Sequence, residues 1–352
     1  MKNKKQWILG LWVLVALVCL LVWGRDRMHF DFGVFRAQLA RADWRKIGLA
    51  TGCIYLAYLF RSVRWALLLR HNKKVPPFSL LGTQVIGFTA VALIGRVADP
   101  VRPYLVSKKT GLPLSSQIAV YIVERMFDLG SMALIFSLVL LTAKEALPHP
   151  ELLLRVAKGG LLATLAMAAF TVVVRLSGGI VAAFMERSLG IFSSKLGHGV
   201  GEKIRTFQTG LDTMRSFTDF GAAALLSIGM WILISLAYLE TTQAFLASPQ
   251  LAAMTLAKCM VLMASSMVAS GFQLPILGWF TQIGLVAAAM SSFFGVAPEP
   301  AAACGATLLA VTFLSIIPVG LIWARFDHVS LRKITKESEI TAEELVVDEP
   351  AG

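Results

Sequence analysis

Two short stretches of the chain place ionisable side chains inside otherwise apolar sequence. Residues 95–106 read GRVADPVRPYLV, and residues 123–128 read VERMFD within a longer apolar run. A polar group in hydrocarbon is costly unless it is paired or wetted, so ionisable residues at membrane depth are candidates for function. The candidates in these stretches are Arg96, Asp99, Arg102, Tyr104, Glu124, Arg125 and Asp128.

The spacing of these residues suggests what they could do. Glu124 and Asp128 are four residues apart and share one helix face, while Arg125 is turned about 100° away. An arginine left free could grip a lipid phosphate bidentately, with the carboxylates orienting it or meeting a cationic headgroup. The same residues could instead form an internal ion-pair network that pins residues 95–106 to the bundle. The two interpretations are compatible, and the sequence leaves both open.

Four further polar residues lie in apolar segments. Gln273 and Gln282 complete the candidate substrate-binding set, and each could line a polar cavity or simply make an interhelical hydrogen bond. Arg61 and Arg64 lie near the end of an apolar segment. Because long basic side chains there can extend to the lipid headgroups, we expect both to be interfacial anchors.

The composition is that of a polytopic membrane protein. Of the 352 residues, 57% are hydrophobic and 15% are charged, whereas a soluble domain carries about 25% charged residues. The formal net charge is +12, and the basic residues cluster at the ends of apolar segments. This distribution indicates membrane topology and not nucleic-acid binding.

We expect no metal, no cofactor and no enzymatic activity. The four cysteines lie in apolar segments without CxxC spacing, and the five histidines form no HExxH pair. Such cysteines are expected to be small buried hydrophobes. With no metal-ligand cluster beside the carboxylates at 124 and 128, a membrane-embedded lipid enzyme is the least favoured class.

We predict an all-α helix bundle of about eight spans with one re-entrant hairpin. The hairpin is expected at residues 78–106, which are too short for two spans of about 20 residues each. A hairpin there puts most basic loops and both termini in the cytoplasm. Residues 30–46, which would lie outside, are interpreted as an interfacial amphipathic helix. The spans are expected at residues 7–23, 47–69, 117–142, 152–174, 221–245, 252–270, 278–295 and 302–324.

A second break, SGFQLPILG at residues 270–278, contains a proline that removes a helical hydrogen bond. One broken segment in each half of a chain is typical of transporters with internal repeats and a midplane binding site. Inverted repeats are therefore suspected here. We assign residues 1–328 to the membrane domain and expect the acidic residues 329–352 to form a disordered cytoplasmic tail.

Four motifs give the chain a family resemblance: RSVRW at 61–65, GRVADPVRPY at 95–104, VERMFD at 123–128 and LPILG at 274–278, continuing to Gly284. In this order they resemble the lysylphosphatidylglycerol synthase transmembrane-region family. That family includes the flippase-like part of the bacterial multiple peptide resistance factor and many stand-alone relatives. The resemblance covers nearly the whole chain and implies a lipid flippase fold.

Two departures from the family pattern limit what the resemblance implies. Gln282 stands where relatives usually have a glutamate, which puts a cationic-headgroup role at this position in doubt. The soluble domain that transfers lysine from tRNA in the bifunctional relatives is missing here. We therefore do not expect lysyl transfer from this polypeptide.

The leading hypothesis is a flippase of the bacterial inner membrane that moves a charged lipid headgroup between leaflets through a polar cavity. The expected substrates are an anionic or aminoacylated phospholipid or a polyprenyl-linked glycolipid. The alternative is a non-catalytic membrane subunit that docks a lipid-modifying or glycosyl-transferring enzyme. A homo-oligomer, or a complex with a separate lipid-modifying enzyme, is compatible with either hypothesis.

Overall fold

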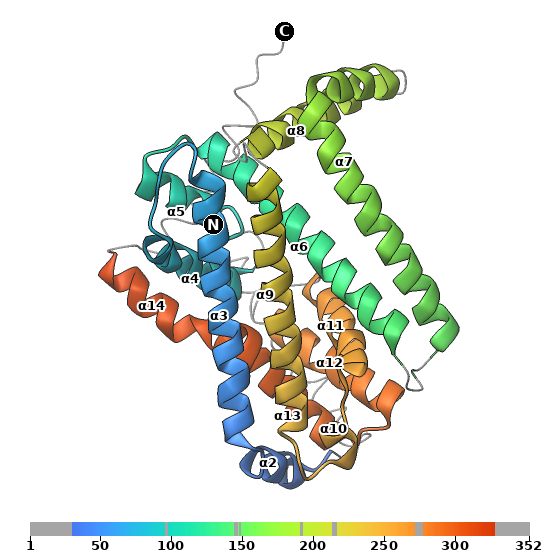
Figure 1. Ribbon diagram of the computed structural model, residues 1–352. Helices are drawn as coiled ribbons and strands as arrows, with labels where there is room; N and C mark the ends of the chain where they lie inside the picture. Colours follow the sequence, from blue (N-terminus) through green and yellow to red (C-terminus); the bar gives the residue numbers. More distant parts are fainter. Residues whose placement is uncertain are drawn as a thin grey trace, which may run out of the picture.

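The computed structural model describes residues 30–95, 98–143, 147, 149–190, 193–212, 217–271 and 277–327. Within these ranges all regular structure is helical, as predicted (Figure 1). The elements are α2 Phe32–Ala40, α3 Trp44–Leu69, α4 Pro77–Ile94, α5 Val101–Thr110, α6 Leu114–Thr142, α7 Pro150–Gly190, α8 Ser194–Asp212, α9 Phe217–Gln243, α10 Pro249–Ala252, α11 Leu256–Gly271, α12 Leu277–Phe294, α13 Pro298–Leu309, the π-helical η2 Ala310–Leu314, and α14 Ile316–Phe326.

Local sequence explains several helix boundaries. Asp31 and Asp43 accept hydrogen bonds from backbone N–H groups at the starts of α2 and α3, at 2.7 Å from Gly33 and 2.9 Å from Arg45, as N-cap residues do. Gly111 follows α5 with a φ of +69°, a left-handed conformation that glycine adopts at low cost. The chain therefore leaves α5 in a tight turn that leads directly into α6.

Six helical segments in the described part of the chain are long and apolar enough to cross a membrane. The prediction of a polytopic helical membrane protein is thus confirmed. The expected first span at 7–23 and the expected tail at 329–352 lie outside the described residues. The six segments are Trp44–Leu69, Pro77–Ile94, Leu114–Thr142, Pro150–Val174, Thr218–Gln243 and Pro298–Phe326.

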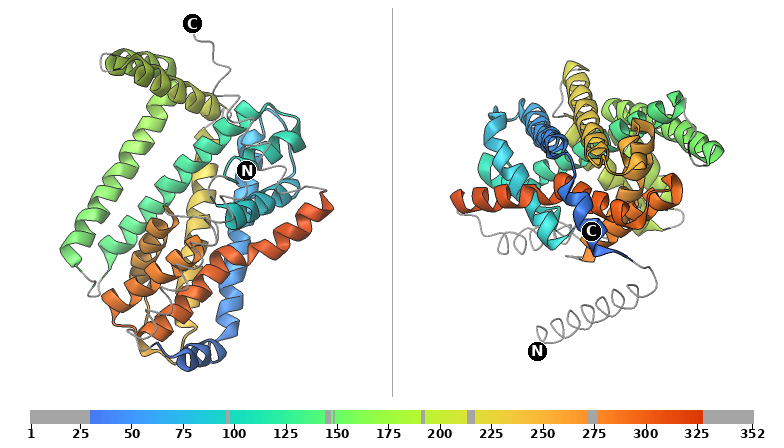
Figure 2. Two further views of the ribbon diagram at one scale, coloured as in Figure 1. Left: turned by 180° about the vertical axis from the view of Figure 1, so that it is seen from behind. Right: turned by 90° about the horizontal axis from the view of Figure 1, so that it is seen from below.

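Helices α3 and α9 form an antiparallel pair through the centre of the bundle (Figures 1 and 2). At one end of the pair Lys46 Nζ lies 3.3 Å from Glu240 Oε2. At the other end Asp219 of α9 pairs with Arg70 and with His71, whose Nε2 lies 2.7 Å from the carboxylate. Ion pairs at both ends fix the register of the two helices.

Two helical hairpins lie in opposite halves of the bundle. Figure 1 shows α4 and α5 beside the upper half of α3, and α11 and α12 in the lower half next to α9. The first hairpin coincides with the residues predicted to be re-entrant, although α4 alone is long and apolar enough to cross a membrane. The second hairpin contains the predicted break at 270–278, and its helices α11 and α12 largely overlap the spans expected at 252–270 and 278–295. The tips approach one another, since Trp279 of α12 donates its indole N–H to the Ala92 carbonyl of α4 at 3.2 Å.

The order of elements repeats with opposite orientation. One helix before the long helix, the long helix itself, a hairpin and a further long helical segment follow one another in α2–α6 and again in α8–α14, where the short α10 is inserted after α9. Because α3 and α9 run in opposite directions, the second set is turned over relative to the first (Figure 1). This arrangement matches the inverted repeats that the two sequence breaks suggested.

The last span is not one continuous α-helix. A π-helical segment separates α13 from α14, and Pro318 in α14 lacks the N–H that would continue the helical ladder. Tyr55 of α3 donates its hydroxyl hydrogen to the Ser315 carbonyl at 2.9 Å, which satisfies a backbone acceptor at the break. The predicted span 302–324 therefore bends where α14 turns toward α4.

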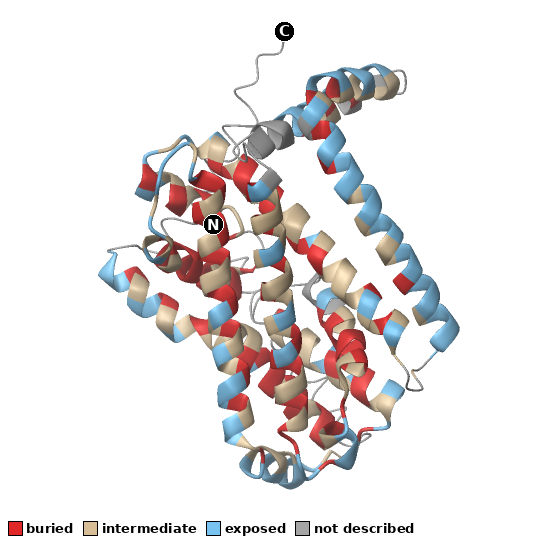
Figure 3. Cartoon of the chain, viewed as in Figure 1, coloured by how far each residue is buried: buried red, intermediate tan, exposed pale blue. Residues whose placement is uncertain are grey.

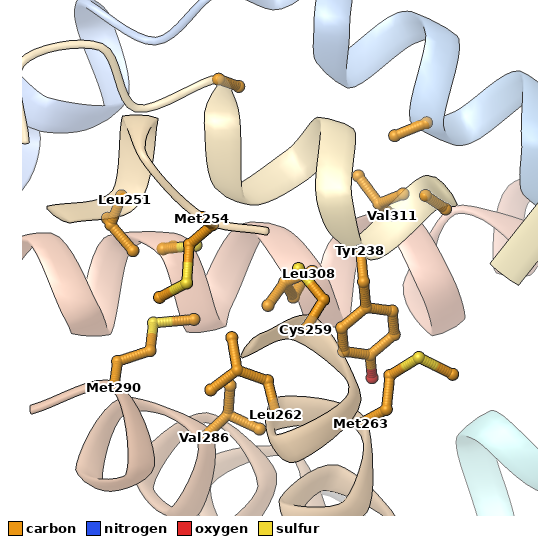
Figure 4. Packing of buried hydrophobic residues seen from close by; sticks show 14 of the residues in the cluster. Tyr238, Leu251, Met254, Cys259, Leu262, Met263, Val286, Met290, Leu308 and Val311 are labelled. Carbon is orange, nitrogen blue, oxygen red and sulfur yellow. The ribbon is translucent and has the colours of Figure 1, made fainter. Parts of the chain in front are cut away.

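Burial is concentrated where the second hairpin meets α9 and α13, while α7 is largely exposed (Figure 3). Figure 4 shows methionine and aliphatic side chains packed around Cys259 in this core. Only 11% of the apolar part of α7, within Pro150–Val174, is buried. An apolar helix exposed to this extent fits a position against lipid.

The α3–α9 contact predicts a strong difference between two glycines of α9. A Cβ at Gly229 would lie 2.8 Å from Cε2 of Phe60, whereas a Cβ at Gly221 meets nothing within 4 Å. Gly229→Ala should destabilise the protein by about 1–3 kcal/mol through overpacking. The matched control Gly221→Ala should be neutral or stabilising by up to about 1 kcal/mol.

Thermal unfolding of both purified variants in detergent measures this difference. A melting temperature for Gly229→Ala at or above that of Gly221→Ala would contradict the close α3–α9 packing.

Candidate functional site

Seven charged side chains from α3, α5, α6 and the loop before α5 gather at one place in the described structure. We call them the charged cluster: Arg61, Arg64, Asp99, Arg102, Glu124, Arg125 and Asp128.

Arg64 lies at the centre of the charged cluster and bridges both carboxylates of α6. Its Nη2 lies 2.8 Å from Oε1 of Glu124, and its Nη1 lies 2.7 Å from Oδ1 of Asp128. The same Nη1 donates to the Ser227 hydroxyl of α9. The Arg64 and Glu124 side chains are each 1% exposed, so this ion pair lies fully within the protein.

Arg61 and Arg64 are not interfacial anchors, and that prediction is wrong. With Trp65 and Leu68 they recur at positions i, i+3, i+4 and i+7 of α3, which places all four on one helix face. All four are buried, because this face of α3 is turned toward α6 and α9. The position of Arg61 and Arg64 near the end of α3 suggested that they reach the membrane surface. They are buried instead, because the helix face that carries them is turned toward the inside of the bundle.

Arg102 brings the first hairpin to the same carboxylate. Its Nη2 lies 2.7 Å from Oε2 and 2.9 Å from Oε1 of Glu124, and the side chain is 0% exposed. Its Nε and Nη2 also donate to Oε1 of Gln84 on α4, at 2.9 and 2.7 Å. Gly87 of α4 makes room for this side chain, because a Cβ there would overlap the Arg102 stem.

Aromatic rings line the guanidinium groups of the charged cluster. Arg102 lies 4.4 Å from the ring centroid of Phe88 and 5.2 Å from that of Trp65. Arg61 lies over the same Phe88 ring at 4.8 Å. These cation–π contacts stabilise the guanidinium groups where water is scarce, and they place Arg61 and Arg102 around one shared neighbour.

Arg125 and Asp99 form the more accessible edge of the charged cluster. Their side chains are 37% and 32% exposed, and Arg125 Nη2 lies 4.0 Å from Asp99 Oδ1. Arg125 also lies 3.9 Å from Oδ2 of Asp128 and over the Tyr121 ring at 4.9 Å. The charged cluster thus extends from a half-exposed edge to a fully buried interior.

Positive charge exceeds negative charge in this group of described residues. Four guanidinium groups face three carboxylates, and the buried part holds Arg61, Arg64 and Arg102 against Glu124 and Asp128. Buried charges require partners, and a surplus cation is an attractive site for an anion.

One protein-family model matches most of the chain. Residues 7–322 match the model of the family described as lysylphosphatidylglycerol synthase TM region. The chain belongs to this family. No curated protein and no solved structure matches the chain.

Membership of the lysylphosphatidylglycerol synthase TM region family, together with the helical spans, makes this a multi-pass membrane protein with a lipid-related role. All three early family motifs contribute to the charged cluster. RSVRW supplies Arg61 and Arg64, GRVADPVRPY supplies Asp99 and Arg102, and VERMFD supplies Glu124, Arg125 and Asp128.

The remaining candidates lie elsewhere. Tyr104 has its ring 4.7 Å from the Lys108 ammonium on the same helix, and Gln282 donates to the Ser266 hydroxyl at 2.8 Å within the second hairpin. Arg96 and Gln273 lie outside the described residues. Sequence reasoning missed Gln84, which is polar but sits in an apolar helix without a charged neighbour in the sequence.

The central position of Arg64 predicts a large effect of its removal. Arg64→Ala would leave Asp128 without its 2.7 Å partner and remove one of the two arginines of Glu124. Breaking a buried pair in this way costs about 3–5 kcal/mol, so the variant should melt at a clearly lower temperature in detergent.

The matched control is Arg155→Ala on α7. That arginine is 82% exposed and lies 4.0 Å from Glu151 one turn away, a surface pair of little value. Equal melting temperatures for the two variants would show that Arg64 is not the centre of the charged cluster.

Proposed function

We propose that this protein moves a charged lipid headgroup between the two leaflets of the membrane, and that the charged cluster is the headgroup site. The observation that carries the proposal is a buried group of charges with surplus guanidinium, placed beside the first of two hairpins that lie in opposite halves of the bundle. Charges inside a membrane protein are costly and commonly mark the path of a substrate.

The arrangement of the hairpins supports transport. Broken helices in inverted repeats hold the substrate near the membrane centre in many transporters, and rocking of one repeat against the other exposes the site to each side in turn. Here the hydrogen bond from Trp279 to the Ala92 carbonyl joins the two hairpin tips. Rearrangement at this contact would open the charged cluster from one half or the other.

We also propose that the lipid is bound and moved without any bond in it being made or broken. Guanidinium and carboxylate groups paired with one another suit recognition by charge and hydrogen bonding. The lipid-related role of the family supports a lipid as the substrate.

We place the protein in the bacterial inner membrane with the α8 end of the bundle in the cytoplasm. That end carries Lys108, Lys109, Lys203 and Arg205, as the positive-inside rule favours. A fluorescent protein fused after residue 327 should fluoresce in cells. A dark fusion together with an active alkaline phosphatase fusion at the same site would reverse the orientation.

Reconstitution into proteoliposomes tests the transport proposal. Wild-type protein should speed the exchange of a fluorescent phospholipid between leaflets, measured by bleaching the outer leaflet with dithionite. Arg102→Gln removes the charge that reaches Glu124 from α5, so its exchange rate should fall to that of protein-free vesicles. Arg155→Gln, an exposed change on α7, should behave as wild type.

Melting temperatures separate transport from folding. A folded Arg102→Gln protein that exchanges lipid at the wild-type rate would exclude the charged cluster as the headgroup site. Wild-type protein that exchanges no lipid above the protein-free background would exclude the proposed function itself.

A further inference from the structure

The carboxylates of the charged cluster already have guanidinium partners. Glu124 accepts hydrogen bonds from Arg64 and Arg102 through both oxygens at 2.7–2.9 Å. Asp128 accepts from Arg64 at 2.7 Å and lies within 3.9 Å of two further arginines. Asp99 lies 4.0 Å from Arg125. Oδ2 of Asp128 makes no hydrogen bond in the described structure, but each of the three carboxylates already faces at least one guanidinium group that competes with an amine on a substrate.

The available hydrogen-bond donors of the charged cluster are cationic instead. Nη1 of Arg61 and Nη1 of Arg102 are buried atoms without a hydrogen-bond partner in the described structure. Arg61 reaches its closest carboxylate oxygen only at 3.7 Å, beyond hydrogen-bond distance. A buried donor without an acceptor costs free energy, so an incoming anionic oxygen would be bound favourably at both atoms.

The two arginines are arranged to act on one anion. Both guanidinium groups lie over the ring of Phe88, which α4 places between α3 and α5. Arg102 is held in position by Gln84 and Glu124, so its remaining donor is preorganised. Arg61 has no comparable hydrogen bond holding its Nη1 in the described structure and can turn toward a ligand.

We infer that the charged cluster recognises the phosphate of a net-anionic lipid headgroup, held between Arg61 and Arg102, and discriminates against headgroups that carry an amine. The inference rests on the proposed function in taking a lipid as the ligand, and it narrows the class of that lipid. Beyond the half-exposed pair of Arg125 and Asp99, the buried part of the charged cluster holds three guanidinium groups against two carboxylates. An ammonium group on the same headgroup would be repelled by this surplus positive charge.

The described helices of the second hairpin, α11 and α12, contain no carboxylate that could bind an amine. Residue 282 is a glutamine, and its amide donates to the Ser266 hydroxyl at 2.8 Å. The carbonyl oxygen of this amide is a neutral acceptor, which binds an ammonium group less strongly than a carboxylate does.

Lipid retention by the purified protein tests the inference separately from transport. The protein is equilibrated in detergent with an equal mixture of phosphatidylglycerol, which is anionic, and lysyl-phosphatidylglycerol, which carries two amines and is net cationic. Native mass spectrometry then counts the lipid that stays bound. We expect wild type to prefer phosphatidylglycerol by about tenfold, because the surplus guanidinium groups repel the two ammonium groups of the lysylated lipid, and a repulsion of about 1.4 kcal/mol corresponds to this ratio.

Arg61→Gln is the decisive variant, because this side chain makes no short ion pair and its loss should leave the protein folded. We expect the preference to fall to near equality in Arg61→Gln and to persist in Arg155→Gln. Equal retention of the two lipids by wild type, a preference for the lysylated lipid, or an unchanged preference in folded Arg61→Gln would each overturn the inference.

An excess of inorganic phosphate distinguishes a lipid phosphate from free phosphate. We expect it to leave most phosphatidylglycerol bound, because the acyl chains also contribute to retention. Binding of inorganic phosphate alone, without retention of either lipid, would contradict a lipid ligand. Selective retention of phosphatidylglycerol without lipid exchange in proteoliposomes would support the inference and reject transport. Lipid exchange together with a preference for the lysylated lipid would support transport and reject the inference.

Discussion

The structure depends on one buried arginine that holds two carboxylates. Arg64 of α3 joins Glu124 and Asp128 of α6 and also reaches Ser227 of α9. In an interior of low dielectric these charges are tolerated only because each has a close partner of opposite sign. Helices α3, α6 and α9 are therefore fixed around this point. Helix α5 is tied to it through Arg102.

This constraint explains why a structural network and a binding site can be the same residues. Complete pairing would give a neutral lock, but the charged cluster contains one more guanidinium than carboxylate among its described members. Arg64 has the shortest contacts with both carboxylates of α6, while Arg61 has only a distant one. Arg64 therefore suits stability, and Arg61 suits a ligand. The sequence left open an internal ion-pair network and a binding site for an anion, and these two interpretations apply to different arginines.

The sequence predicted the class of fold and the main charged residues, but not how they combine. Apolar runs longer than 20 residues and charges at positions 102, 124 and 128 are visible in one dimension, since hydropathy and helical spacing are local properties. The partner of those carboxylates was missed because Arg64 lies near a helix end, where a basic residue usually reaches the membrane surface. Only the packing of α3 against α6 and α9 shows that its face is turned inward.

The neighbours of Arg102 on α4 were missed for a related reason. Gln84 and Phe88 were missed because neither differs from ordinary residues of an apolar helix until Arg102 is placed against them. What the sequence lacked in each case was a long-range contact.

The most direct test of this account is a structure of the protein in nanodiscs that contain phosphatidylglycerol, determined by cryo-electron microscopy at a resolution that shows side chains. The account predicts density for a lipid phosphate within hydrogen-bond distance of Arg61 and Arg102, with the Arg64 pairs to Glu124 and Asp128 intact. Lipid density confined to the outer surface of the bundle, with Arg61 and Arg102 paired only to protein, would contradict it.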